Sequence, residues 1–149
     1  MNAFEFFVPG KPHGQGRPRA TTVGGRARMY EKSEDRDWKS RVYHEWTAIG
    51  SPRFEHAQTY WECHIIAVFR RPAGHFRADG VSLSASGARQ PRPARSPDVD
   101  QIAKGPMDVL VKAGAVPDDA RCCLLTVEKR WETAGMPEGV YIRIVEVNK

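Results

Sequence analysis

The strongest strand signal in the sequence is Trp61-Glu62-Cys63-His64-Ile65-Ile66-Ala67-Val68-Phe69. Apolar residues alternate here with a second set that is itself partly apolar, which predicts a central strand with both faces partly covered. Shorter strand patterns lie at residues 4–8, 121–130 and 140–147. The sequence therefore predicts about four strands.

Two main helices are expected between these strands. Ser33 is a suitable N-cap, and the apolar residues after it recur at helical spacing, which predicts a helix over residues 33–48; they are Trp38, Val42, Trp46 and Ile49. A second helix is expected to begin at or just after Asp100 and to stop at Gly114. The fold class is therefore α/β (α+β).

The length of 149 residues and a net charge of +5 fit one basic domain. No apolar run approaches the roughly 20 residues that cross a bilayer, and the N-terminus lacks the features of a signal peptide, so we expect no membrane contact and a cytoplasmic location. Cys63, Cys122 and Cys123 show no metal-binding or disulfide spacing, so buried thiols are expected.

Two segments rich in glycine, proline and arginine separate the predicted elements: a basic loop at residues 10–28 and an insert at residues 71–96. Neither is expected to contain a packed regular element, and the insert is expected to be flexible until it meets a ligand. Cations on such segments suit a DNA backbone, although a merely solvated surface is the alternative. The candidate DNA-binding residues are Lys11, Arg17, Arg19, Arg26, Arg28, Arg70, Arg71, His75, Phe76 and Arg77.

Two pairs of carboxylates flank the second predicted helix. Asp98 and Asp100 stand at its start, and Asp118 and Asp119 follow it in a turn. If the first pair stays extended, its two carboxylates face the same way. Steps of four residues from Asp100 define a polar stripe on one helix face, made of Lys104, Asp108 and Lys112.

Carboxylates without neighbouring His or Cys suit Mg²⁺ or Mn²⁺. Such an ion activates water for phosphodiester hydrolysis, and a nearby ammonium group neutralises a phosphate oxygen or the leaving group. Each piece alone has a plainer interpretation: a helix cap at Asp98 or Asp100, an exposed ion pair between Asp100 and Lys104, or a polar turn at residues 118–119. Only the combination points to a metal-dependent phosphodiesterase.

The combined pattern is Pro97-Asp98-x-Asp100-x-x-x-Lys104-x-x-x-Asp108, then Gly114 and Asp118-Asp119 opening a strand that ends in Lys129. It resembles the RusA family of Holliday junction endodeoxyribonucleases, and Gly16-Arg17-Pro18-Arg19, Tyr30 and the loop at 75–80 are similar to its phage and prophage branch. The resemblance implies a homodimer with a small mixed sheet. It also implies paired symmetric nicking of four-way DNA junctions with magnesium or manganese and without an organic cofactor.

By position, the resemblance makes Asp98, Asp100 and Asp119 the metal-binding acids and Lys104 the catalytic lysine. Asp108 and Asp118 match as helpers or structural residues, and Gln101 is a possible helper that departs from the family pattern. Apart from the resemblance, the loop aromatic Phe76 is a candidate wedge at the unstacked centre of a junction, with a crystal or partner contact as the alternative.

Two features depart from the family pattern. Gln101 stands where the family usually has Asn, and Gly105-Pro106 falls inside the expected helix, where proline removes a backbone hydrogen bond. Either the helix is kinked after Lys104, or a short turn at Asp100 precedes a new helix with Pro106 at its first position.

Two alternative functions stay open. A restriction-like nuclease would need a separate strand with an acidic residue, one intervening residue and a lysine, which Glu128-Lys129 does not provide. A catalytically inactive module that binds branched DNA is the other, with Gln101 and Pro106 as signs of decay. Retention of all three candidate ligands and Lys104 favours the enzyme.

Overall fold

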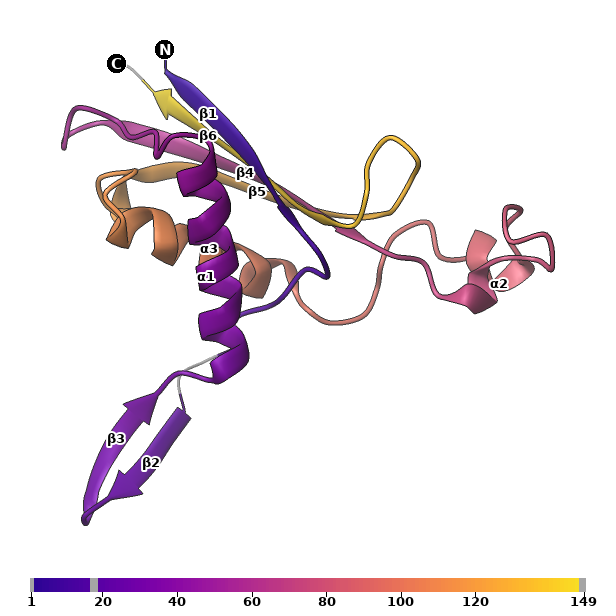
Figure 1. Ribbon diagram of the computed structural model, residues 1–149, viewed down its shortest axis with the longest axis horizontal. Coiled ribbons are helices and arrows are strands. Elements are labelled where there is room, and N and C mark those ends of the chain that lie inside the picture. The colour runs from indigo at the N-terminus through magenta and orange to yellow at the C-terminus, as the bar shows by residue number, and fades with distance from the viewer. Residues whose placement is uncertain (1, 17–18, 148–149) are drawn as a thin grey trace.

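The computed structural model describes residues 2–16 and 19–147, and its centre is a four-stranded mixed sheet with the order β1-β6-β4-β5 (Figure 1). The strands are β1 (Ala3–Pro9), β4 (Tyr60–Phe69), β5 (Cys122–Trp131) and β6 (Gly139–Val147). The β4 and β5 strands are parallel, whereas β6 is antiparallel to both β1 and β4. The predicted mixed sheet of four strands is confirmed.

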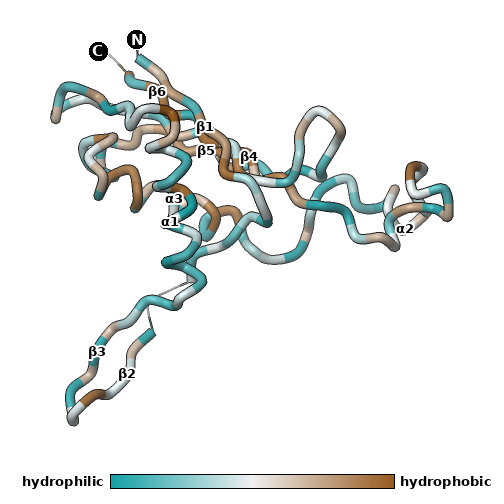
Figure 2. The backbone as a smooth tube through the Cα atoms, in the orientation of Figure 1, coloured by the Kyte–Doolittle hydropathy of each residue, from teal (hydrophilic) through white to brown (hydrophobic). Residues whose placement is uncertain are grey.

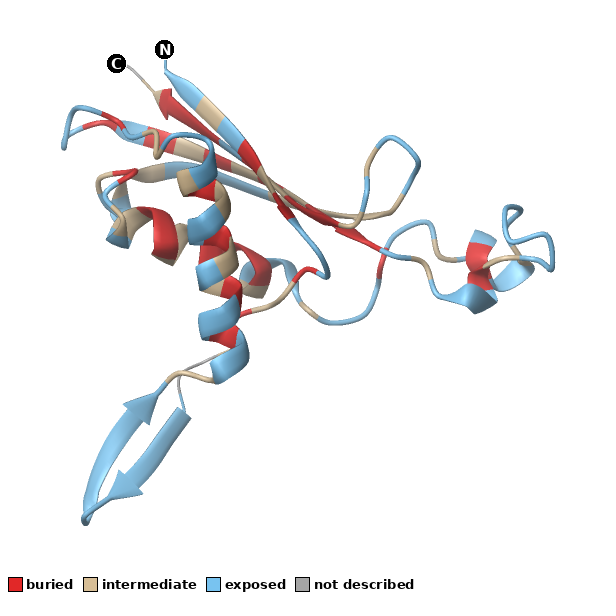
Figure 3. Cartoon of the chain, viewed as in Figure 1, coloured by how far each residue is buried: buried red, intermediate tan, exposed pale blue. Residues whose placement is uncertain are grey.

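The core lies between this sheet and the helices α1 (Ser33–Ala48) and α3 (Val99–Lys112), which cover one face (Figure 1). β4 is an inner strand, and its core-facing residues are buried as the alternation predicts. Three of the four tryptophans, Trp38, Trp46 and Trp61, are each at most 2% exposed. The most hydrophobic segments accordingly lie in the sheet and α3 (Figure 2), where the buried residues concentrate (Figure 3).

The α3 helix runs unbroken through Pro106, so the alternative of a short turn and a new helix is wrong. Gly105 and Pro106 are buried, and a Cβ atom at Gly105 would lie 2.7 Å from Nε1 of Trp38. The pair therefore permits the close approach of α3 to α1. The helix begins at Val99, one residue earlier than expected, which leaves Asp98 extended (φ −75°, ψ 156°) and Asp100 helical.

Residues 10–28 were expected to lack regular structure, but part of this segment forms a hairpin. β2 (Arg19–Val23) pairs with β3 (Arg26–Tyr30). Gly24 and Gly25 have φ angles of +59° and +76°, as a two-residue hairpin turn of type I′ requires. All ten strand residues are exposed (Figure 3), and the hairpin projects away from the sheet (Figure 1).

The insert also contains short helices where none was expected: η1 (Ala73–His75) and α2 (Ala85–Ala88). It projects from the end of β4, well apart from the hairpin (Figure 1). Within the described residues, no helix is long and apolar enough to cross a membrane.

The expectation of three buried thiols holds only for Cys63. Its burial raises the pKa of the thiol to about 12. Cys122 is half-buried and Cys123 is exposed, because both lie at the start of the edge strand β5.

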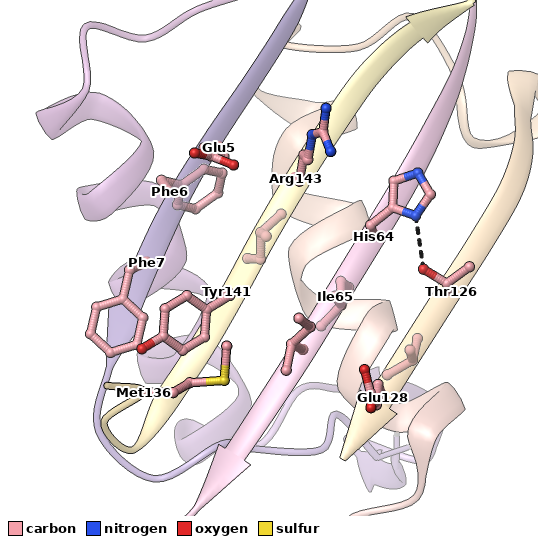
Figure 4. A pocket seen from close by; sticks show the side chains of 13 residues that line it. Glu5, Phe6, Phe7, His64, Ile65, Thr126, Glu128, Met136, Tyr141 and Arg143 are labelled. Atoms are coloured by element: carbon pink, nitrogen blue, oxygen red, sulfur yellow. Dashed lines mark hydrogen bonds between the residues drawn. The ribbon is translucent and has the colours of Figure 1, made fainter. Parts of the chain in front are cut away.

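Among residues 2–16 and 19–147, no helix covers the other face of the sheet, which holds a shallow pocket (Figure 4). The rings of Phe7 and Tyr141 pack here with their centroids 4.5 Å apart. His64 Nδ1 lies 2.9 Å from the Thr126 hydroxyl on the neighbouring strand. None of the predicted site residues lines this pocket.

Candidate active site and DNA-binding surface

The predicted acidic site begins at the N-terminus of α3. Asp98 is the N-cap residue, and its backbone N–H donates to Oε1 of Gln101 at 3.4 Å. This bond is one half of a capping box, which an amide side chain completes well. Gln101 therefore has a structural role in the first turn, and the carboxylates of Asp98 and Asp100 are exposed beside it.

The polar stripe on α3 forms as predicted, but its members differ in environment. Asp100, Lys104 and Lys112 are exposed, whereas Asp108 is half-buried. Within the part of the chain that the structure describes, Lys104 makes no ion pair or side-chain hydrogen bond. Its ammonium group therefore remains available to a phosphate.

Asp108 is held by residues from two other segments. Its Oδ2 atom accepts a hydrogen bond from Gln15 Nε2 at 3.1 Å and lies 3.6 Å from Lys39 Nζ. Lys39 also pairs with Glu31 at 2.6 Å. Partial burial alone would lower the pKa of Lys39, but hydrogen bonding and the charges of Glu31 and Asp108 outweigh it and raise the pKa. Lys39 is thus a fixed positive charge between two acids.

The segment 13–15 packs along the start of α3. The Gln15 backbone N–H donates to the Gln101 carbonyl at 3.0 Å, and a Cβ atom at Gly14 would lie 2.3 Å from Cβ of Pro97. His13 Nε2 lies 2.6 Å from Oδ1 of the buried Asp35 on α1. Sequence reasoning missed these contacts, because no local pattern marks them.

Asp118 and Asp119 lie in and beside η2 (Asp119–Arg121), which contacts α3. The Asp118 carboxylate accepts a hydrogen bond from the Ala120 backbone N–H at 3.1 Å, which lowers the pKa of Asp118. Hydrogen bonding to Asp118 raises the pKa of Asp119, and the charge of Asp108 adds to this effect. A cation at this position would favour the ionised form of both acids.

The acidic residues of α3 and η2 lie on elements that contact each other, but their carboxylates are not close enough together to form a metal site. Over residues 2–16 and 19–147, no three His, Cys, Asp or Glu side chains gather closely enough to hold a metal ion. The donor chemistry of Asp98, Asp100 and Asp119 nevertheless suits a hard divalent cation, since all three offer exposed carboxylate oxygens.

Most predicted DNA-binding cations are exposed. Arg17 lies outside the described residues. Three exposed arginines, Arg19, Arg26 and Arg28, lie on the hairpin. Lys11 is exposed on the segment that follows β1, Arg70 directly after β4, and Arg77 on the insert.

Arg71, His75 and Phe76 are less exposed than these cations and have contacts that hold the insert together. Arg71 donates to the carbonyls of Gly87 and Gln90 at 3.2 and 3.3 Å, and its guanidinium lies 5.0 Å from the Trp131 ring centroid. His75 is 7% exposed with its ring edge-on to Trp131. Phe76 is half-buried and forms a bridge with Leu83, which does not suit a free wedge.

Comparison with family models matches residues 9–145 to a family described as Endodeoxyribonuclease RusA. Because the match covers nearly the whole chain, the chain belongs to the RusA endodeoxyribonuclease family. Membership of this family implies a Holliday junction endonuclease that acts on branched DNA. A search of curated protein sequences finds no match.

Proposed function

We propose that this chain is a metal-dependent, structure-specific endonuclease that resolves Holliday junctions by paired symmetric nicks through phosphodiester hydrolysis. The observation that carries the proposal is the exposed set of carboxylates on the adjoining elements α3 and η2, with Lys104 one turn along α3 from Asp100. Carboxylates alone would repel DNA, and the exposed arginines of the hairpin and insert offset that repulsion.

Magnesium or manganese is the proposed cofactor, with Asp98, Asp100 and Asp119 as its protein ligands. When bound, the ion supplies activation of water and neutralisation of the charge that develops on the phosphate. Lys104 holds a positive charge for a phosphate oxygen or the leaving group. Asp108 is a positioning residue, because Gln15 and Lys39 already engage its carboxylate.

The proposed assembly is a homodimer. Two cuts across a two-fold symmetric junction call for two sites, and a C2 dimer provides them. The uncovered sheet face is the candidate contact, since Phe7 and Tyr141 present their rings there and Glu5 lies opposite Arg143, so both charge signs are present (Figure 4).

Tyr141→Lys is expected to yield monomers in sedimentation velocity, whereas Tyr43→Lys on α1 should leave the dimer intact. Monomeric unaltered protein would contradict the assembly.

The test of the activity is cleavage of a labelled mobile four-way junction, with linear duplex as the control, in magnesium, in manganese and in EDTA. We expect metal-dependent paired nicks on the junction alone. Asp100→Asn should abolish cleavage while junction binding is kept or slightly tightened, because one negative charge near phosphate is removed.

Two lysines on the same exposed stripe give a matched comparison. Lys104→Ala should lower the cleavage rate by 10²-fold or more, an effect on the order of that of a lost oxyanion donor. Lys112→Ala should have little effect, since it lies about 12 Å further along the helix. Equal rates for the two variants would remove Lys104 from the catalytic residues.

A catalytically inactive module that binds branched DNA is the second candidate. The absence of a closed three-acid group among the described residues favours it. Tight junction binding without cleavage in any metal would support it over the nuclease.

A further inference from the structure

The β2–β3 hairpin has two chemically different faces. Residues directly opposite each other in an antiparallel ribbon share a face, as do residues two apart on one strand. The register therefore gathers all three arginines of the ribbon on one face, made of Arg19, Thr21, Val23, Arg26, Arg28 and Tyr30. The other face carries only Ala20, Thr22, Ala27 and Met29. We call these the arginine face and the small face.

No core explains this arrangement. Every residue of both strands is exposed, including Met29 at 66% and Val23 at 51%. An isolated two-stranded hairpin is marginally stable in water, so a ribbon without a packed face gains order from a partner. Residues 19–30 include no Asp or Glu, and within the described chain no carboxylate pairs with the three arginines. The partner that complements this charge is a polyanion.

The base of the ribbon is tied to the acidic helix. Glu31 directly follows Tyr30 and pairs with Lys39 on α1, which in turn lies 3.6 Å from Asp108 on α3. These contacts anchor the base of the ribbon on the same side of the molecule as the carboxylates of α3.

We propose that the arginine face of the hairpin enters the major groove of a duplex arm of the branched DNA. The groove is about 12 Å wide and admits a two-stranded ribbon, whose strands lie about 4.8 Å apart. Five residues per strand extend about 17 Å, enough to lay the three guanidinium groups along the groove. The inference rests on the proposed function only in taking DNA as the partner.

The decisive test moves one positive charge from the arginine face to the small face. Arg28→Ala should weaken junction binding about tenfold. It should also make the fall of log K with log salt less steep, by about 0.9 in the magnitude of the slope. The double variant R28A/A27R restores the net charge but places it on the small face. We expect it to bind as weakly as R28A, whereas recovery of full affinity would show that only net charge matters and would overturn the face assignment.

Two controls make the assignment sharper. The double variant T22A/M29A alters only the small face and should bind as the unaltered protein does. Junctions whose arms are cut below one duplex turn, about 10 base pairs, should abolish the difference between R28A and the unaltered protein, because the ribbon then has no groove to enter. A difference that persists on short arms would place the ribbon at the junction centre and contradict the proposal.

The outcomes separate this inference from the proposed function. Junction cleavage by the unaltered protein tests the nuclease independently of the hairpin. Cleavage together with normal DNA binding by R28A would overturn only the hairpin inference. Failure to cleave, with binding that depends on the face of the arginine, would overturn only the nuclease.

Discussion

The β2–β3 hairpin and the insert of residues 71–96 are both rich in arginine, and both project from the sheet and helices (Figure 1). Arg77, Arg89 and Arg95 of the insert are exposed, as the hairpin arginines are, but its other two arginines are already engaged by partners. Those of the hairpin are exposed on one face. In the insert, Arg71 binds backbone carbonyls and stacks on Trp131, and Arg92 pairs with Glu128 on β5.

This difference shows that cationic composition does not equal cationic surface. A guanidinium group that already donates to backbone carbonyls, as Arg71 does, or to a carboxylate, as Arg92 does, has fewer N–H donors left for a phosphate. Within the insert, Arg71 therefore stabilises the packing, whereas Arg77, Arg89 and Arg95 stay exposed for DNA contact like the arginines of the hairpin.

The largest expected effect is the loss of packing in the insert on substitution of Gly87, for which a glycine of the hairpin provides the control. A Cβ atom at Gly87 would lie 2.2 Å from the His75 carbonyl oxygen, a clash between backbone groups that the insert can relieve only by unpacking. Gly87→Ala should raise amide hydrogen exchange across the insert by about tenfold or more.

Gly24→Ala is the matched control in the hairpin. Open space surrounds this position, so only the positive φ of +59° opposes the substitution, at about 1 kcal/mol. Exchange in the insert should be unchanged in this variant. Equal protection of the insert in Gly87→Ala and the unaltered protein would show that its packing is loose.

A second, smaller effect compares the loss of one charge in each region. Arg28→Gln should lower the salt slope of DNA binding by about 0.9, because an exposed guanidinium displaces counterions. Arg71→Gln should leave that slope unchanged and instead destabilise the insert by about 1–3 kcal/mol, since the carbonyl of the buried Gly87 loses its donor, whereas that of Gln90 keeps Trp131 Nε1. Salt titration and Trp131 fluorescence measure the two effects. A lowered slope for Arg71→Gln would mean that Arg71 contacts DNA after all.

Glu128→Gln should make the arginines near Glu128 more available to DNA, as those of the hairpin are. The carboxylate pairs with Arg92 and lies 2.7 Å from Arg130, so its neutralisation removes the ion pair of each guanidinium group and leaves only hydrogen bonds to hold them. DNA affinity is expected to rise by a few-fold and the salt slope by up to about 0.9 for each arginine that reaches a phosphate. Unchanged binding isotherms across the salt series would show that neither arginine faces the DNA.

The smallest effect is the pH dependence of the same contact. Hydrogen bonds from Arg130 and Arg92 lower the pKa of Glu128 from 4.5 to about 2. Because the folded pKa is depressed, the contact stabilises the folded chain fully above about pH 4.5 and is lost as the pH falls through 2. The carboxylate is exposed, so added salt weakens the effect.

Carboxyl titration followed by NMR measures this pH dependence. In Arg130→Ala the Glu128 midpoint should move up toward 4.5, since the largest cause of the depression is removed. An unmoved midpoint would assign the depression to another group.

Periodicity in the sequence predicted the four strands and both main helices, because each element buries one side at a regular interval. The hairpin was missed, although Val23-Gly24-Gly25-Arg26 contains a recognised two-glycine turn signal. The insert could not have been predicted in this way, since its packing depends on Arg71 meeting Trp131 from a distant strand.

The features of the candidate site also fall into those set by local sequence and those set by contacts between distant segments. The spacing of Asp98, Asp100 and Lys104 along one segment is local, so the sequence located them. The hold on Asp108 depends on Gln15 and Lys39, which come from separate parts of the chain. No spacing rule links residues whose contact arises only when a loop packs on a helix.

The sequence by itself determined the four strands of the main sheet, the two main helices and the positions of the acidic residues, because these follow from local periodicity and spacing. The family resemblance came from the motif that these acidic residues form. Only the tertiary structure decided which charges are free. Pairing in space, as between Arg92 and Glu128, offsets the charge of a surface cation, whereas the hairpin register gathers three arginines on one exposed face. Burial and pairing depend on neighbours that are distant in the chain, so composition alone could not separate the two basic segments.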